Sequence, residues 1–163
     1  MTTALFLGRF QPFHNGHLNV IKEALKEVNE LIIGITHNNE ANKEENPFSA
    51  DERREMITNT LVHNDITNFK IIVVEDSEDD KEWVENLENK AKFDVVYMSD
   101  KNTFGEKWVE RCLKEKYTIR KIKSLQGIDA TTIREKIKNK EMWKGLVPRE
   151  VADSVSKIIH LRE

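Results

Sequence analysis

The chain contains few cysteines, prolines and glycines. Its 163 residues include one cysteine, Cys112, three prolines and six glycines. A single cysteine excludes an internal disulfide framework, and the N-terminus lacks the basic, apolar and small-residue pattern of a secretory signal. We therefore expect a cytoplasmic protein, and a chain of this length fits one domain over residues 1–163.

Long apolar runs and an excess of positive charge are also lacking. No run approaches the ~20 apolar residues that cross a bilayer. The formal net charge is −3, whereas nonspecific binding of nucleic acid depends on a basic surface. We expect neither a membrane nor nucleic acid as a partner, while local anion sites stay open.

Short apolar runs alternate with amphipathic patterns, which is typical of repeated strand–helix–strand units. The runs predict strands at 3–7, 31–35, 70–74, 95–98 and 118–122, and the amphipathic patterns predict helices at 16–28, 50–62, 80–90, 105–116, 131–139 and 149–160. Continuous apolar runs suit strands that are covered on both faces. We predict an α/β fold: a Rossmann-like, doubly wound parallel sheet of about five strands with helices on both faces.

Directly after the first predicted strand comes the most informative segment of the chain. It reads Gly8-Arg9-Phe10-Gln11-Pro12-Phe13-His14-Asn15-Gly16-His17. A loop between a strand and a helix exposes unpaired backbone N–H groups at the positive end of the helix dipole, where anions bind. Two imidazoles three residues apart, with Gly16 before the second, add ring donors without crowding a ligand. The segment therefore predicts a phosphate site.

The two histidines have two plainer explanations. The pair could ligate a metal, but Zn²⁺ needs three or four protein ligands, and Cys112 lies in a helix-like segment. Either histidine alone could be an ordinary core or surface residue. The surrounding ten residues favour the phosphate site, so we expect no metal bound by the protein itself. The chain also lacks Gly-x-Gly-x-x-Gly after the first strand and the P-loop pattern, which argues against dehydrogenases and P-loop enzymes.

The same segment resembles the His-x-Gly-His signature of the nucleotidyltransferases. The longer run Gly-Arg-Phe-Gln-Pro-Phe-His-x-Gly-His-Leu is similar to that of the archaeal-type nicotinamide mononucleotide (NMN) adenylyltransferases. The resemblance implies that the ATP-binding residues are Gly8, Arg9, Phe10, His14, Gly16 and His17. His17 would donate to the α-phosphate and His14 to the β- and γ-phosphates, with Arg9 between the donor and acceptor phosphates.

A second anion site is expected where the fifth predicted helix begins. The run Ala130-Thr131-Thr132-Ile133-Arg134 resembles the second signature of the family. The resemblance implies that Thr131, Thr132 and the helix N-terminus contact the β- and γ-phosphates, while Arg134 offsets their charge. A threonine that merely caps the helix is the alternative.

Acceptor-binding residues are implied by two further runs. Arg53 ends Pro47-Phe48-Ser49-Ala50-Asp51-Glu52-Arg53, which is similar to a family element whose arginine holds the acceptor phosphate. A surface ion pair is the alternative for Arg53, and helix capping explains Ser49 and Glu52. The resemblance also places an exposed Trp83 ring on the nicotinamide, with Asp76 and Asp80 nearby; a core-facing ring is the alternative.

Departures from the family pattern gather around the expected acceptor pocket. The run Thr36-His37-Asn38-Asn39 stands where a Gly-Ser-x-Gln-like run is expected, Ser99-Asp100-Lys101 replaces Gly-Asn-Pro, and Asp80 replaces an amide. We predict a Mg²⁺-dependent transfer of AMP from ATP to NMN, with Mg²⁺ held mainly by the triphosphate. The alternatives are another acceptor (FMN, phosphopantetheine or a polyol phosphate), a CTP donor, or a nucleotide-sensing module without turnover. By resemblance, the chain would form trimers or hexamers.

Overall fold

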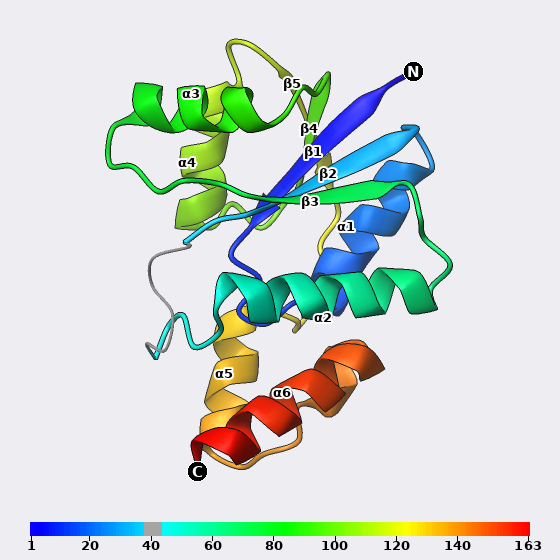
Figure 1. The fold of residues 1–163 in the computed structure, drawn as a ribbon, viewed down its shortest axis with the longest axis vertical. Coiled ribbons are helices and arrows are strands. Elements are labelled where there is room, and N and C mark those ends of the chain that lie inside the picture. Colours follow the sequence, from blue (N-terminus) through cyan, green and yellow to red (C-terminus); the bar gives the residue numbers. More distant parts are fainter. Residues whose placement is uncertain (38–43) are drawn as a thin grey trace.

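Five parallel strands form one sheet in the order β3-β2-β1-β4-β5 (Figure 1). The computed structural model describes residues 1–37 and 44–163, so Asn38 and Asn39, which belong to a run that departs from the family pattern, lie outside the described residues. The strands are β1 (Thr3–Gly8), β2 (Glu30–Ile35), β3 (Phe69–Val73), β4 (Val95–Ser99) and β5 (Thr118–Ile122). The helices are α1 (Asn15–Leu25), α2 (Ala50–His63), α3 (Asp80–Lys90), α4 (Phe104–Leu113), α5 (Ala130–Lys138), the short 3-10 helix η1 (Lys144–Leu146) and α6 (Arg149–Arg162).

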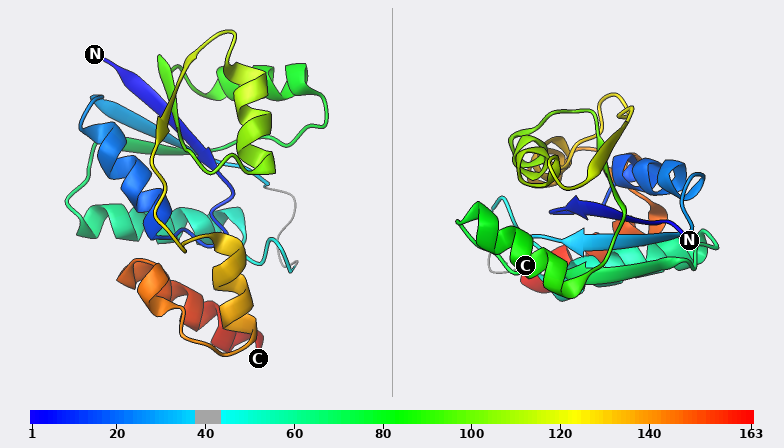
Figure 2. Two further views of the ribbon diagram at one scale, coloured as in Figure 1. Left: turned by 180° about the vertical axis from the view of Figure 1, so that it is seen from behind. Right: turned by 90° about the horizontal axis from the view of Figure 1, so that it is seen from above.

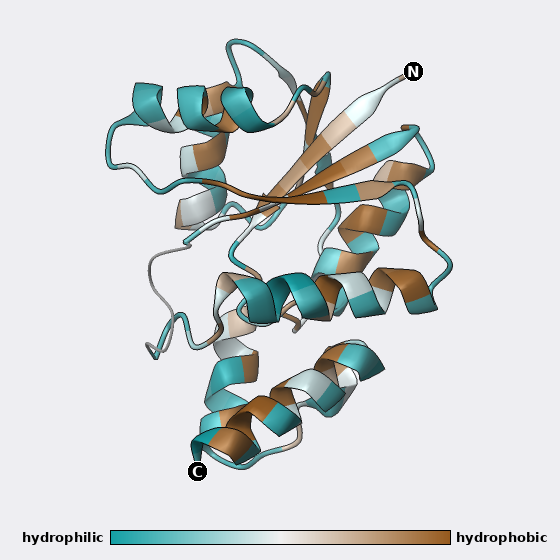
Figure 3. Cartoon of the chain, in the orientation of Figure 1, coloured by the Kyte–Doolittle hydropathy of each residue, from teal (hydrophilic) through white to brown (hydrophobic). Residues whose placement is uncertain are grey.

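Successive residues of each strand face two separate cores, because side chains alternate across a sheet. Ala4 and Phe6 of β1 pack with α1 and α2, whereas Leu5 packs with α3 and α4. Figure 2 shows helices on both faces of the sheet, and Figure 3 shows hydrophobic strands beside largely hydrophilic loops. The predicted Rossmann-like α/β fold with helices on both faces is confirmed.

The strand order reverses between β1 and β4, which are hydrogen-bonded neighbours. Consecutive strands are added on one side from β1 to β3 and on the other side from β4 to β5. In open parallel sheets, ligands bind beyond the carboxyl ends of the strands at this reversal point. The loop that carries the two histidines leaves β1 there, and the turn that carries Lys101 leaves β4 beside it.

The last two helices lie beyond the carboxyl edge of the sheet (Figure 1). Helix α6 packs along α2, and α5 begins next to the loop after β1, where Arg134 donates to the carbonyl of Gln11 at 2.8 Å. No helix within residues 1–37 and 44–163 combines the length and the apolar character that a membrane crossing needs.

Candidate active site

The motif from His14 to His17 folds as a capping box made of two histidines. Backbone N–H groups of Gly16 and His17 donate to Nδ1 of His14 at 3.0 and 3.4 Å. In return, the backbone N–H of His14 donates to Nδ1 of His17 at 3.0 Å. A capping box needs its two side chains at the N-cap and three residues later. The His-x-x-His spacing is therefore the spacing of a helix N-terminus.

The capping hydrogen bonds fix the protonation of both rings. Because each Nδ1 accepts a hydrogen bond, the proton of each neutral ring is on Nε2. The pKa of His14 is lowered to about 3, chiefly by burial and secondly by the charge of Lys101, while the charge of Asp129 opposes the shift. Burial is also the main cause of a pKa of His17 well below 6.5, followed by the charges of His14 and Lys101. Both imidazoles are neutral donors at physiological pH.

The two rings stack and present their donors together. Their centroids are 3.6 Å apart with 21° between the planes. Among the described residues, no buried side-chain nitrogen or oxygen lacks a hydrogen-bond partner. No protein group accepts from either Nε2 of the pair there, so these atoms reach the surface of the site. His14 and His17 thus offer two adjacent N–H donors to one ligand.

Small and aromatic neighbours hold the stacked rings in place. A Cβ atom on Gly16 would lie 2.8 Å from Cε1 of His14, so a larger residue would displace the ring. The ring of Phe13 stacks on His17 at 5.4 Å, and Phe10 meets it edge-on at 4.8 Å. Phe10, expected to contact ATP, has a side chain only 1% exposed. Its ring packs against His17, so any contact of Phe10 with ATP would come from its backbone, and the same ring leaves room only for glycine at Gly8.

Two arginines from distant parts of the chain meet at the histidine loop. Arg9 donates through Nε and Nη2 to Oδ1 of Asn46 at 3.1 and 2.7 Å. Arg134 donates through Nη2 to the hydroxyl of Thr131 at 3.4 Å. Burial lowers the pKa of Arg134, and the charge of Arg9 lowers it further. This like-charge proximity favours binding of an anion between the two guanidinium groups.

The beginning of α5 differs in detail from its expected arrangement. Asp129 is the N-cap: its Oδ1 accepts from the N–H of Thr132 at 2.7 Å, and its Oδ2 accepts from the Thr132 hydroxyl at 3.0 Å. The hydroxyl of Thr132 is therefore engaged within the cap. Thr131 is exposed and does not cap the helix. Its hydroxyl and the N-terminus of α5 therefore face the site, where they can contact a ligand.

Lys101 is a site residue that the sequence reasoning missed. Its ammonium donates to the carbonyl of Ile128. That carbonyl oxygen lies 3.9 Å from the position that a Cβ on Gly16 would occupy. The turn after β4 therefore brings a cation beside the histidine motif. The only sequence signal was the departure from Gly-Asn-Pro at this position.

Arg53 does not reach into the site, and its predicted contact with the acceptor phosphate is not supported. The side chain is 0% exposed. Its guanidinium donates to four carbonyls: Ser49 at 3.2 Å, Arg9 at 2.8 Å, Thr36 at 2.5 Å and His37 at 3.1 Å. Burial lowers the pKa of Arg53 to about 10, and Asp76 opposes this shift. Arg53 instead ties the loops after β1 and β2 to α2.

The predicted exposed ring of Trp83 is wrong as well. Trp83 is 2% exposed and packs edge-on against Trp108, with centroids 4.4 Å apart. Asp80 accepts from Nε1 of Trp108 at 3.0 Å and from Arg111 at 3.0 Å, so its carboxylate joins α3 to α4. Asp76 accepts from the backbone N–H of His37 at 3.1 Å. These side chains are engaged in packing and loop contacts.

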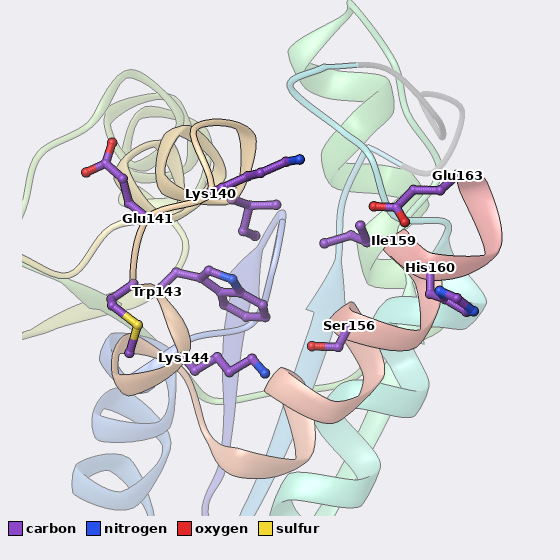
Figure 4. A pocket seen from close by; sticks show the side chains of 10 residues that line it. Lys140, Glu141, Trp143, Lys144, Ser156, Ile159, His160 and Glu163 are labelled. Carbon is purple, nitrogen blue, oxygen red and sulfur yellow. The ribbon is translucent and has the colours of Figure 1, made fainter.

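A cavity of about 440 Å³ lies away from the histidine motif, between the end of α5 and α6 (Figure 4). Trp143, Lys144, Ser156 and Ile159 are among the residues that line it. None of the expected site residues borders this cavity. Within the described ranges, no three His, Cys, Asp or Glu side chains are grouped so that they could hold a metal ion.

Comparisons with known proteins identify the family of the chain. Residues 5–156 match the family model described as cytidylyltransferase-like. The chain is 38% identical over 159 residues to a nicotinamide-nucleotide adenylyltransferase of Methanococcus aeolicus, covering 95% of this chain and 88% of the relative. It is 36% identical over 159 residues to the protein of that name from Thermoplasma volcanium, covering 95% and 86%.

A solved structure shares the fold. It is a bifunctional NMN adenylyltransferase/ADP ribose pyrophosphatase from Francisella tularensis, complexed with AMP and a manganese ion. The TM-score is 0.74 at 25% identity, and the match covers 90% of this chain but 44% of that longer one. Taken with the family match and the relatives above 30% identity, the chain belongs to the cytidylyltransferase-like family and, within it, to the nicotinamide-nucleotide adenylyltransferases.

Proposed function

We propose that this chain transfers AMP from ATP to NMN, giving NAD and pyrophosphate. The observation that carries the proposal is the stacked pair of neutral imidazoles at the start of α1, whose two Nε2 donors face a site bordered by cations. The names of the sequence relatives support NMN as the acceptor. A site with this donor set suits a polyphosphate chain.

The chain aligns the reactants and stabilises the charge on the phosphates. A phosphate monoester is already nucleophilic near neutral pH, so no covalent enzyme intermediate is needed. An oxygen of the NMN phosphate attacks the α-phosphorus of ATP, the bond to the bridging oxygen of the β-phosphate breaks, and pyrophosphate leaves in line. In this proposal, His17 donates to the α-phosphate and His14 to the β- and γ-phosphates. Since their free ring nitrogens carry protons, neither histidine acts as a base.

The N-terminus of α5 forms the other side of the polyphosphate site. Its backbone N–H groups and the exposed Thr131 hydroxyl bind the β- and γ-phosphates in this proposal, and Arg134 offsets their charge. One Arg134 nitrogen already donates to the carbonyl of Gln11 at 2.8 Å, which fixes the guanidinium at the loop. Arg9 lies between the donor and acceptor phosphates.

The donor set also bears on the expected Mg²⁺. Imidazole, guanidinium and backbone N–H groups bind anions, and the carboxylate of Asp129 is engaged by Thr132. We therefore propose that Mg²⁺ is held mainly by the triphosphate and water, where it neutralises phosphate charge. By resemblance to the family, we also propose that the protein is cytoplasmic and assembles into a trimer or hexamer. Light scattering coupled to gel filtration measures the mass of the assembly.

An acceptor panel tests the proposed reaction. NMN, nicotinic acid mononucleotide and FMN are each incubated with ATP or CTP and Mg²⁺, and pyrophosphate release is measured. We expect the fastest release with ATP and NMN. Faster release with another acceptor, with phosphopantetheine, or with CTP would redefine the substrates, and nucleotide binding without any release would indicate a sensor.

The same assay tests the histidine pair. Loss of one charge-stabilising donor typically lowers the rate by ~10²–10³, so we expect a decrease of this size for His17→Ala. His160→Ala is the matched control because His160 is exposed on α6. Equal rates for His17→Ala and wild type would show that the proposed role of His17 is wrong.

A further inference from the structure

Hydrogen bonds hold the turn that carries Lys101 at the carboxyl end of β4. The residue before it, Asp100, donates its backbone N–H to the carbonyl of Ile122 at 3.0 Å. The Asp100 carboxylate also accepts from the backbone N–H of Ser124 at 2.9 Å. The backbone N–H of Lys101 donates to the hydroxyl of Ser99 at 3.5 Å. These contacts fix the turn after β4 against the chain that follows β5.

The ammonium of Lys101 lies between the two helix N-termini of the phosphate site. It donates to the carbonyl of Ile128, the residue just before the N-cap of α5. That carbonyl borders Gly16 in the first turn of α1. The positive charge contributes to the lowered pKa of both His14 and His17. Independent contacts thus place the cation beside both elements that border the polyphosphate site.

The ammonium has donors left for a ligand. A lysine ammonium carries three N–H donors, and the contact with Ile128 is its one hydrogen bond to another group within residues 1–37 and 44–163. Asp129, the nearby acid, directs its carboxylate to Thr132. A cation with two spare donors, next to two imidazole donors, matches a multiply charged phosphate chain.

We propose that Lys101 is a further phosphate-binding residue, whose ammonium donates to the β- or γ-phosphate of ATP and remains bound to pyrophosphate as it leaves. The inference rests on the proposed function, because it assigns Lys101 to the same polyphosphate site. Lys101 lies in the run Ser99-Asp100-Lys101, which departs from the Gly-Asn-Pro that the resemblance to the family implies at this position. The plain alternative is that Lys101 only ties the turn after β4 to the start of α5.

The reverse reaction separates these explanations. Lys101→Met keeps the length of the side chain and removes its charge, Lys101→Arg restores the charge, and Lys107→Met on the exposed surface of α4 is the matched control. We measure ATP formation from NAD and pyrophosphate, and binding of Mg²⁺ and α,β-methylene-ATP by calorimetry. A hydrogen bond to a charged group accounts for about tenfold to a hundredfold in binding. We expect Lys101→Met to raise the KM for pyrophosphate and the Kd of the analogue by at least tenfold, with the KM for NMN within twofold.

Several results would overturn the proposal. Lys101→Met could match Lys107→Met in both assays, or the change could fall on the KM for NMN alone. Lys101→Arg could restore the melting temperature without restoring affinity for pyrophosphate. That result would show that Lys101 only ties the turn after β4 to the start of α5. If wild type forms no NAD, the proposed function fails, and analogue binding by wild type and Lys101→Met still decides the role of Lys101.

Discussion

The residues expected to bind ligands lie at two sides of the carboxyl edge of the sheet, and the two sets differ in whether their side chains reach the site. On the side formed by the loop after β1 and the start of α5, His14, His17 and Arg134 have donors that reach the site. On the side formed by α2 and α3, Arg53 and Trp83 are buried. The first set is fixed by its own backbone, whereas the second contributes to protein packing. A motif that resembles a family signature therefore identifies ligand contacts most securely where its spacing also determines the local backbone structure, as the His-x-x-His spacing does in the capping box of α1.

Trp83→Ala gives the largest expected effect on the packed side. Removing a buried tryptophan typically costs about 3–5 kcal/mol of stability, and we expect a loss of this size in the free energy of unfolding by urea. The KM for NMN should change less than twofold. Phe104→Ala is the control, because Phe104 is 88% exposed and surface changes shift stability by about 0.5 kcal/mol or less. A raised KM for NMN with unchanged stability would indicate that Trp83 contacts the acceptor.

Arg53→Met tests the other buried residue of that side. The substitution leaves four carbonyls without their donor, and each buried unsatisfied acceptor is costly, so we expect a loss of about 3 kcal/mol. The neighbouring Arg54→Met, which changes an exposed side chain, should lie close to wild type. If Arg53→Met keeps its stability and loses affinity for NMN, the guanidinium binds the acceptor after all.

The neutral histidines predict a pH dependence of stability on the phosphate side. The pKa of His14 is lowered to about 3, chiefly by burial and secondly by the charge of Lys101, so between this value and 6.5 the unfolded chain binds a proton that the folded chain does not. The stabilisation is present above pH 6.5 and is lost as the pH falls toward 3. We expect a loss of about 2 kcal/mol from His14 between pH 7 and 5. His14→Asn, which keeps an N-cap residue, should lose less over the same interval in urea unfolding; an equal loss would contradict the assignment.

The sequence predicted the sheet well because apolar runs and helix periodicity are local properties. The burial of Trp83 also had a signal: with Val84 and Leu87 it makes up the apolar face of α3. Arg53 likewise stands in the stripe of Met56, Ile57 and Leu61 on α2. The family resemblance predicted ligand contacts for Trp83 and Arg53, whereas the helix periodicity indicated that both are buried.

Other features depend on contacts that no local pattern contains. The carbonyl partners of Arg53 come from loops after two different strands. Lys101 reaches the site only because β4 lies beside β1 in the sheet. Such long-range contacts follow from the assembled fold, so they could not be predicted from spacing alone.

The most direct measurement is a long-range ¹H–¹⁵N NMR spectrum of the histidine rings, recorded at pH 7 with and without ATP and Mg²⁺. His14→Asn and His17→Asn assign the two rings. Our account predicts neutral rings protonated on Nε2 in the free protein, with both Nε2 signals shifting when ATP binds. Rings protonated on Nδ1, or Nε2 signals that stay unchanged at saturating ATP, would contradict the claim that this pair holds the triphosphate.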